Sequence, residues 1–180
     1  MSQPLLLTAL SVPIAEQSVD EHYHVVYRFL VRLCGNLDTA EELTQETFAR
    51  AWAARRTFRG ESSQKTWLLQ IARNLYLNQQ RRHAETRIPT DELQAIPDSG
   101  KLGDPARRFA NSQQREIIMA ILAQLPEKQR SIIVLCDAEG LSYAEIADVL
   151  GMSLAAVKVN LFRARHAFRY AYTQQTGGLE

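Results

Sequence analysis

The 180-residue chain lacks most of the features that mark membrane proteins and disulfide-bonded secreted proteins. It has only two cysteines, and no hydrophobic run approaches the roughly 20 residues needed to cross a bilayer. The apolar stretch Leu5–Leu10 is not preceded by the basic residues of a signal peptide. With 46% hydrophobic residues, eight glycines and six prolines, the composition predicts a folded cytoplasmic protein without membrane insertion.

Metal-binding and catalytic patterns are also missing. Cys34 and Cys136 lie in apolar helical patterns far apart in the sequence, so we expect reduced core residues. His22 and His24 precede Cys34, but two histidines one residue apart lie on different sides of a helix. Because the ligand number of a metal site is not met, we predict no metal, no cofactor and no catalytic residue.

The clearest pattern in the chain is a pair of helices between residues 141 and 165. Ser142 and Glu145 form a capping box that begins the first helix, and Gly151 suits the left-handed conformation that ends it. Ser153 can cap the second helix, whose inward face consists of Val157, Leu161, Ala164 and Phe168. The pattern predicts a helix-turn-helix, which places its second helix in the major groove of DNA.

The net charge is only +1, but the charges are unevenly distributed. No Asp or Glu occurs between Ser153 and Thr176, whereas an ordinary surface helix mixes both signs. Residues 55–87 are also markedly basic and contain interleaved aromatic and amide side chains, as binding to single-stranded or distorted DNA requires.

The helix expected before this basic segment is acidic. It should begin at Asp38, with Glu41 completing a capping box. Its exposed side carries a band formed by Glu41, Glu42, Gln45 and Glu46, and its buried side should consist of Leu43, Thr47, Phe48, Ala51 and Trp52. The separation of acidic and basic segments suggests two different partners.

Periodicity predicts an all-α protein with two small helical domains, the second containing the helix-turn-helix. The domains should be joined by a flexible linker, where periodicity fails and prolines and glycines accumulate. The expected parts are an extension at 1–19, a first domain at 20–83, a linker at 84–104, a second domain at 105–173 and a tail at 174–180.

Three motifs, in this order, resemble the sigma-70 family of bacterial RNA polymerase sigma factors. Residues 38–52 resemble the polymerase-binding region, and residues 58–74 resemble the region that binds the promoter −10 element. Residues 125–130 and 140–147, followed by Val157 and Lys158, resemble the −35-binding domain. The short linker and the length are similar to the extracytoplasmic-function (ECF) group.

The resemblance implies a non-enzymatic subunit that binds core RNA polymerase, recognises the −35 and −10 promoter elements and helps to open the duplex. Polymerase contacts with the clamp of the largest subunit are implied for Glu42, Gln45 and Glu46, together with Asp38 and Glu41, and a further contact is implied with the flap. Contacts with −10 DNA are implied for Phe58, Arg59, Gly60, Ser62, Ser63, Lys65, Arg73, Asn74, Asn78 and Arg81. Contacts with −35 DNA are implied for Ser153, Lys158, Val159, Asn160, Phe162, Arg163 and Arg165. An anti-sigma factor that blocks both DNA-binding faces is the expected regulator.

The chain departs from the family pattern after Lys158. Members of the group often have a small polar residue and then an arginine, where this chain has Val159 and Asn160. Valine cannot donate a hydrogen bond but can touch a thymine methyl group, and Asn160 removes a positive charge. The −35 sequence of relatives is therefore not transferable to this chain, and we expect weaker −35 affinity.

Two other functions fit parts of the sequence. A helix-turn-helix regulator acting without core polymerase would explain the second domain, but it leaves the acidic band unexplained. An enzyme could use His22, His24, Cys34, Glu41 and Glu42 of the first domain, but no nucleophile–base pair, phosphate loop or metal-ligand spacing supports it.

Overall fold

The computed structural model describes residues 16–86 and 105–177, and within these ranges all regular structure is helical, which confirms the all-α class. A first lobe contains α1 (Glu16–Cys34), α2 (Leu37–Ala54), the 3-10 turn η1 (Arg55–Thr57) and α3 (Gln64–Thr86). A second lobe contains α4 (Pro105–Gln124), α5 (Glu127–Ile133), the π-helical turn η2 (Val134–Ala138), α6 (Tyr143–Leu150) and α7 (Leu154–Thr176). Residues 1–15 of the expected extension, 87–104 of the expected linker and 178–180 of the tail lie outside the described residues.

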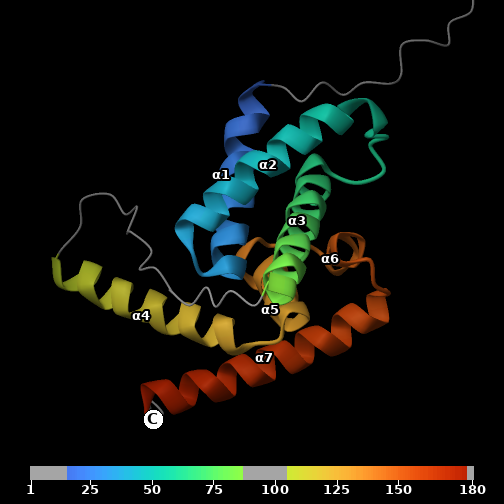
Figure 1. Cartoon of the computed structure of the whole chain (residues 1–180). Coiled ribbons are helices and arrows are strands. Elements are labelled where there is room, and N and C mark those ends of the chain that lie inside the picture. Colours follow the sequence, from blue (N-terminus) through green and yellow to red (C-terminus); the bar gives the residue numbers. More distant parts are fainter. Residues whose placement is uncertain (1–15, 87–104, 178–180) are drawn as a thin grey trace, which may run out of the picture.

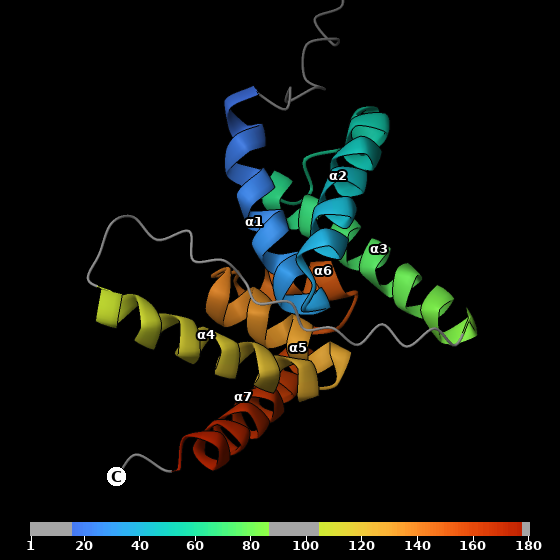
Figure 2. The same cartoon turned by 60° about the vertical axis from the view of Figure 1, so that its left-hand side comes forward.

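The helices form two stacked groups. In Figure 1, α1 and α2 cross in the upper part of the molecule, and α3 runs down from them toward the second lobe. There α3 packs against α6, and α4 and α7 lie side by side below it, as the turned view in Figure 2 also shows.

The helix-turn-helix is confirmed, together with the capping that predicts it. The Ser142 hydroxyl accepts the backbone N–H of Glu145, and the Glu145 carboxylate accepts the backbone N–H of Ser142. Gly151 ends α6 with φ 61°, a left-handed conformation that other residues adopt at a cost. The Ser153 hydroxyl then accepts the N–H of Ala156 at the start of α7.

The start of α2 differs from the expectation. Asn36, rather than Asp38, is the N-cap, and its side-chain oxygen accepts the N–H of Thr39 at 2.9 Å. Gly35, with φ 68°, turns the chain sharply after α1, so the first residue able to cap α2 comes two positions earlier than predicted. Asn is as good an N-cap as Asp, which leaves the Asp38 carboxylate on the exposed side of the helix.

The prediction that Trp52 is buried is wrong, because its side chain is 61% exposed. The buried side of α2 follows the small residues Thr44, Thr47 and Ala51, and Trp52 lies one helical step away from this line. The guanidinium of Arg55 covers the Trp52 ring at 4.3 Å from its centroid, which is a cation–π contact.

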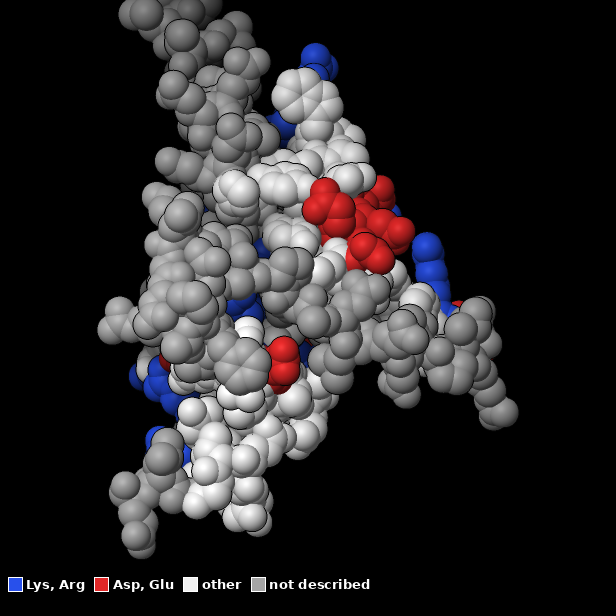
Figure 3. Space-filling model, turned by 90° about the vertical axis from the view of Figure 1, so that its left-hand side faces the viewer, with Lys and Arg blue, Asp and Glu red and all other residues white. Residues whose placement is uncertain are grey.

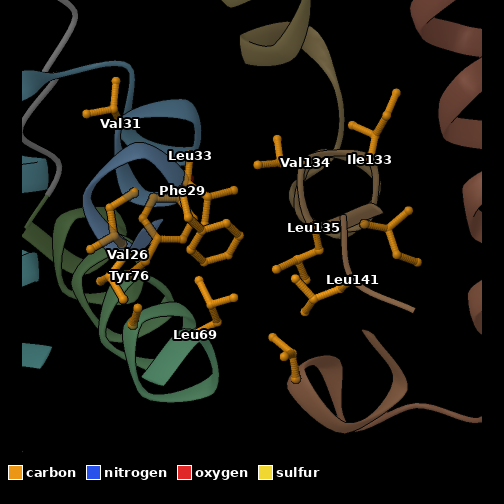
Figure 4. Close-up of a cluster of buried hydrophobic side chains, with 14 of the residues drawn as sticks. Val26, Phe29, Val31, Leu33, Leu69, Tyr76, Ile133, Val134, Leu135 and Leu141 are labelled. Carbon is orange, nitrogen blue, oxygen red and sulfur yellow. The ribbon is translucent and has the colours of Figure 1, made fainter. Parts of the chain in front are cut away.

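The two lobes share one hydrophobic core, an arrangement that the sequence leaves open. Phe29 and Leu33 of α1 are fully buried. Figure 4 shows them with Leu69 and Tyr76 of α3, facing Val134, Leu135 and Leu141 of the second lobe. Both sides of α1 are therefore covered, one by its own lobe and one by the other.

Candidate nucleic-acid and partner interfaces

The acidic band on α2 is exposed. Glu42, Gln45 and Glu46 all face solvent, and the only ion pair found for them among the described residues joins Glu46 to Arg50 at 2.7 Å. Both members of this pair are about half exposed, so the pair contributes little to stability. Figure 3 shows a cluster of Asp and Glu side chains on the upper part of one face, apart from a smaller acidic patch lower down. This band is available to a basic partner.

Glu41 differs from the rest of the band because it serves its own lobe. Its carboxylate accepts the hydroxyl of Tyr23 at 2.5 Å and the side-chain N–H of Gln45 at 3.1 Å. Burial, followed by the hydrogen bond and the negative charge of Glu41, raises the pKa of Tyr23 to about 12. Glu41 therefore tethers α2 to α1.

The loop before α3 combines an aromatic pair with exposed polar residues. Phe58 packs on Trp67 of α3, with ring centroids 4.8 Å apart, and is half-buried. Arg59 and Gly60 are exposed, and Gly60 has φ 70°. The hydroxyl of Ser63 accepts the N–H of Thr66 at 3.1 Å and so caps α3.

The remaining predicted −10 residues form two groups. Ser62 and Asn78 are half-buried, and Asn74 and Arg81 are exposed, with Arg81 donating to the side chain of Asn78. Lys65 and Arg73 instead point at the second lobe. The Lys65 ammonium donates to the backbone carbonyl of Glu139 at 2.6 Å.

Arg73 is 7% exposed and donates through Nε and Nη2 to the two carboxylate oxygens of Glu127, at 3.2 and 3.3 Å. Two further side chains of α3 make contacts in the same direction: Thr66 donates to the carboxylate of Glu145, and Gln70 donates to the carbonyl of Asp148, each at 3.3 Å. We call this packing of α3 against the second lobe the closed arrangement. In it, part of the basic face of α3 contacts the second lobe of the same chain.

Another polar contact between the lobes centres on the buried Glu139, which sequence reasoning missed. Its side chain is 1% exposed, and its two carboxylate oxygens accept Arg28 at 3.1 Å and Arg32 at 2.9 Å. Burial lowers the pKa of Arg32, and the negative charge of Glu139 acts in the opposite direction. No local pattern joins residues 107 and 111 positions apart in the sequence, so only the fold reveals this contact.

The predicted −35 face of α7 is exposed, although Ser153, Asn160 and Arg165 use their side chains in contacts within the lobe. Lys158 and Arg163 face solvent, and Val159 and Phe162 are 49% and 73% exposed. Asn160 is half-buried, and its amide donates to the carbonyl of Ala156 at 2.8 Å.

Arg165 donates its Nε to Asp137 at 3.0 Å, and this pair raises the pKa of the guanidinium further above its ordinary value. A groove of about 490 Å³ lies beside this pair, between α4 and α7. Its apolar walls include Ile118, Leu122 and Phe168, and Arg32 and Arg169 also line it. The groove can hold an apolar segment that carries acidic groups.

The cysteines are free thiols. Burial raises the pKa of Cys34 to about 12, and burial followed by the charge of Asp137 raises the pKa of Cys136. Within residues 16–86 and 105–177, no three His, Cys, Asp or Glu side chains gather in a way that could hold a metal ion. In the same part of the chain, no helix is both long and apolar enough to cross a membrane.

Comparisons with known proteins identify the family of this chain. The family model Sigma-70 region 2 matches residues 19–86, and Sigma-70, region 4 matches residues 115–167. The chain is 34% identical over 161 residues to the ECF RNA polymerase sigma factor SigE of Mycolicibacterium smegmatis, covering 88% of this chain and 62% of that protein. It is 30% identical over 161 residues to the ECF RNA polymerase sigma factor SigM of Bacillus subtilis, covering 87% and 96%.

Among solved structures, the sigma factor RpoE in complex with the anti-sigma factor NepR from Bartonella quintana has a TM-score of 0.73 and 26% identity. The superposition covers 87% of this chain and 94% of RpoE. The family matches, the relatives and the helix-turn-helix lead to one conclusion. The chain belongs to the ECF group of the sigma-70 family of RNA polymerase sigma factors.

Proposed function

We propose that this chain binds core RNA polymerase through α2, directs it to promoters through α3 and α7, and helps to open the duplex at the −10 element. The observation that carries this proposal is the exposed acidic band on α2, next to the basic face of α3 in the same lobe. A helix-turn-helix regulator that acts alone has no need for such a band. The family membership supports the same function.

The polymerase contact is assigned to Glu42, Gln45 and Glu46, with Asp38 at the start of the same exposed side. We assign them to the clamp of the largest polymerase subunit. Glu41 positions the band, because its carboxylate accepts hydrogen bonds from Tyr23 of α1 and from Gln45. The groove between α4 and α7 is the candidate site for the polymerase flap, because its walls are apolar and arginines line it.

The −10 contact is assigned to the loop 58–63 and to the basic and amide side chains of α3. An extruded base costs a few kcal/mol of lost stacking, which the protein must replace with contacts to the base and to the backbone. Lys65 and Arg73 can provide backbone contacts only after they leave Glu139 and Glu127. Binding of −10 DNA therefore requires the lobes to separate.

The −35 contact is assigned to the exposed side of α7, with Lys158, Val159, Phe162 and Arg163 nearest the bases. Arg165 is held by Asp137 and serves at most as a phosphate contact at the edge of this face. This side of α7 is open in the closed arrangement, so −35 binding does not depend on separating the lobes.

The regulator is proposed to be an anti-sigma factor that stabilises the closed arrangement. Support comes from the similarity to RpoE, whose structure was solved in complex with the anti-sigma factor NepR. A protein that binds only the closed arrangement would keep Lys65 and Arg73 covered. It would therefore block −10 recognition without having to cover α3 itself.

The polymerase contact can be tested by substituting Glu42, Gln45 and Glu46 together by Ala and measuring binding to core polymerase. We expect affinity to fall about 3- to 150-fold, because three exposed polar side chains that contribute about 0.2–1 kcal/mol each are lost. The matched control substitutes Glu61 and Glu85 by Ala, which removes two exposed carboxylates of the same lobe outside the band. If both variants bind core polymerase as tightly as the unmodified chain does, the assignment of α2 is wrong. If the chain binds promoter duplex specifically and core polymerase changes nothing, the regulator alternative is favoured instead.

A further inference from the structure

We infer that Val159 and Phe162 make −35 recognition by this chain depend on the C5-methyl group of thymine. The inference rests on the proposed function, which places the exposed side of α7 in the major groove. Val159 is 49% exposed and Phe162 is 73% exposed. Because they are three residues apart on one helix, their side chains are neighbours and form one apolar surface.

Val159 stands where members of the family often have a small polar residue, and Phe162 adds a second apolar side chain beside it. Removing a large apolar side chain from water lowers the free energy, and for an exposed side chain this requires a partner that covers it. In the major groove, the only apolar group that a base pair offers is the thymine methyl group. The apolar pair on α7 therefore matches one chemical feature of the base edges in that groove.

Other side chains of α7 limit which bases this helix can recognise through hydrogen bonds. Asn160 is half-buried, and its amide donates one N–H to the carbonyl of Ala156, which holds this side chain against its own helix. The guanidinium of Arg165 donates to Asp137 at the edge of the exposed side of α7. No carboxylate occurs from Ser153 to Thr176 to accept the amino group of cytosine.

The charged side chains exposed beside the apolar pair are both cationic. Lys158 and Arg163 are exposed on either side of it and suit guanine or phosphate. His166 lies one helical turn beyond Phe162 and is also exposed. Near Val159, A·T pairs are then distinguished from T·A pairs through the position of the methyl group. The expected −35 element combines guanines with thymines, on either strand, at positions that Val159 and Phe162 contact.

The test uses the complete chain assembled with the core RNA polymerase of its host. The preferred −35 element is first selected from promoter duplexes randomised in that region. Each thymine of the selected element is then replaced by deoxyuridine, which lacks only the methyl group. We expect at least one replacement to weaken binding about three- to fivefold, as burial of a single carbon predicts.

The variants Val159→Ala and Phe162→Ala, singly and together, assign each methyl contact to a side chain. The double variant should bind the thymine and deoxyuridine duplexes equally. Because both side chains are largely exposed, their truncation should leave the fold intact, which circular dichroism can verify. The matched control is Tyr170→Ala, which removes another aromatic group of α7 that is 65% exposed, two turns beyond Phe162, and should retain the methyl effect.

The outcomes separate this inference from the proposed function. If no replacement affects binding, or if the double variant still distinguishes thymine from deoxyuridine, Val159 and Phe162 do not read methyl groups. The sigma-factor function would survive that result. If the unmodified chain gives no core-dependent promoter binding at all, the proposed function fails, and this inference fails with it.

Discussion

Replacement of Glu139 by Gln should open the two lobes. The Glu139 carboxylate belongs to the second lobe, and both of its charged partners, Arg28 and Arg32, belong to α1 of the first lobe. Glutamine keeps the shape of the side chain and can still accept one hydrogen bond, but it lacks the charge. The substitution therefore weakens the contact between the lobes and does not impair the folding of the second lobe.

The magnitude follows from burial and distance. A hydrogen bond that involves a charged group contributes about 1.5–3 kcal/mol, and the Glu139 side chain is 1% exposed. Arg32 is 30% exposed and Arg28 is 52% exposed, so the Arg28 pair is the weaker one. We expect a total loss of about 2–3 kcal/mol for the closed arrangement, which is a shift of about 30- to 150-fold toward the open one.

The assay measures binding of the isolated chain to a fluorescent single-stranded −10 oligonucleotide from a mapped promoter. If only the open arrangement binds this strand, apparent affinity rises in proportion to the open fraction until that fraction approaches one. Energy transfer between dyes on exposed sites of α2 and α7 should fall in parallel. The matched control is Asp137→Asn, which neutralises a carboxylate paired with Arg165 in its own lobe. Equal behaviour of the two variants would show that Glu139 does not hold the lobes together.

Two further predictions follow from shifted pKa values. Because burial raises the pKa of Cys34 to about 12, little of the reactive thiolate forms at pH 8, and alkylation followed by mass spectrometry should be at least tenfold slower in the folded chain than in the unfolded chain. The N–H and hydroxyl of Ser142 lower the pKa of Glu145, so its charged form stabilises the fold above the unfolded value, near pH 4, and this contribution is lost as pH falls. In urea unfolding followed by circular dichroism, Glu145→Gln should therefore cost about 1 kcal/mol at pH 7 and progressively less toward pH 3, whereas a constant difference would show that the charge is not involved.

Local sequence signals predicted local structure well. The Ser142–Glu145 capping box, the Gly151 turn and the Ser153 cap each depend on residues within four positions of one another, so the sequence alone contains the whole interaction. The N-cap at Asn36 is also a short-range signal, although Asp38, two residues later, was predicted instead. Such errors shift a helix end and leave the fold unchanged.

The contacts between the lobes could not be predicted in the same way. Phe29 and Leu33 fit no single apolar stripe of α1, because a second stripe is buried by another part of the chain. Arg73 looks like an exposed basic residue until Glu127, 54 positions later, is placed beside it. Helix periodicity identifies which residues share a face, but it does not identify what covers that face.

Under the proposed function, the closed arrangement and −10 recognition compete for the same side chains. Lys65 and Arg73 cannot bind Glu139 and Glu127 and also hold a DNA strand, so each partner of α3 excludes the other. Core polymerase can favour the open arrangement only to the extent that it binds that arrangement more tightly, and it must also compensate for exposing apolar surface at Phe29. The side of α7 that is assigned to −35 recognition is exposed in the closed arrangement, so the same competition does not apply to it. We therefore expect the order of events at a promoter to be polymerase binding with lobe separation first, and capture of the −10 strand only afterward.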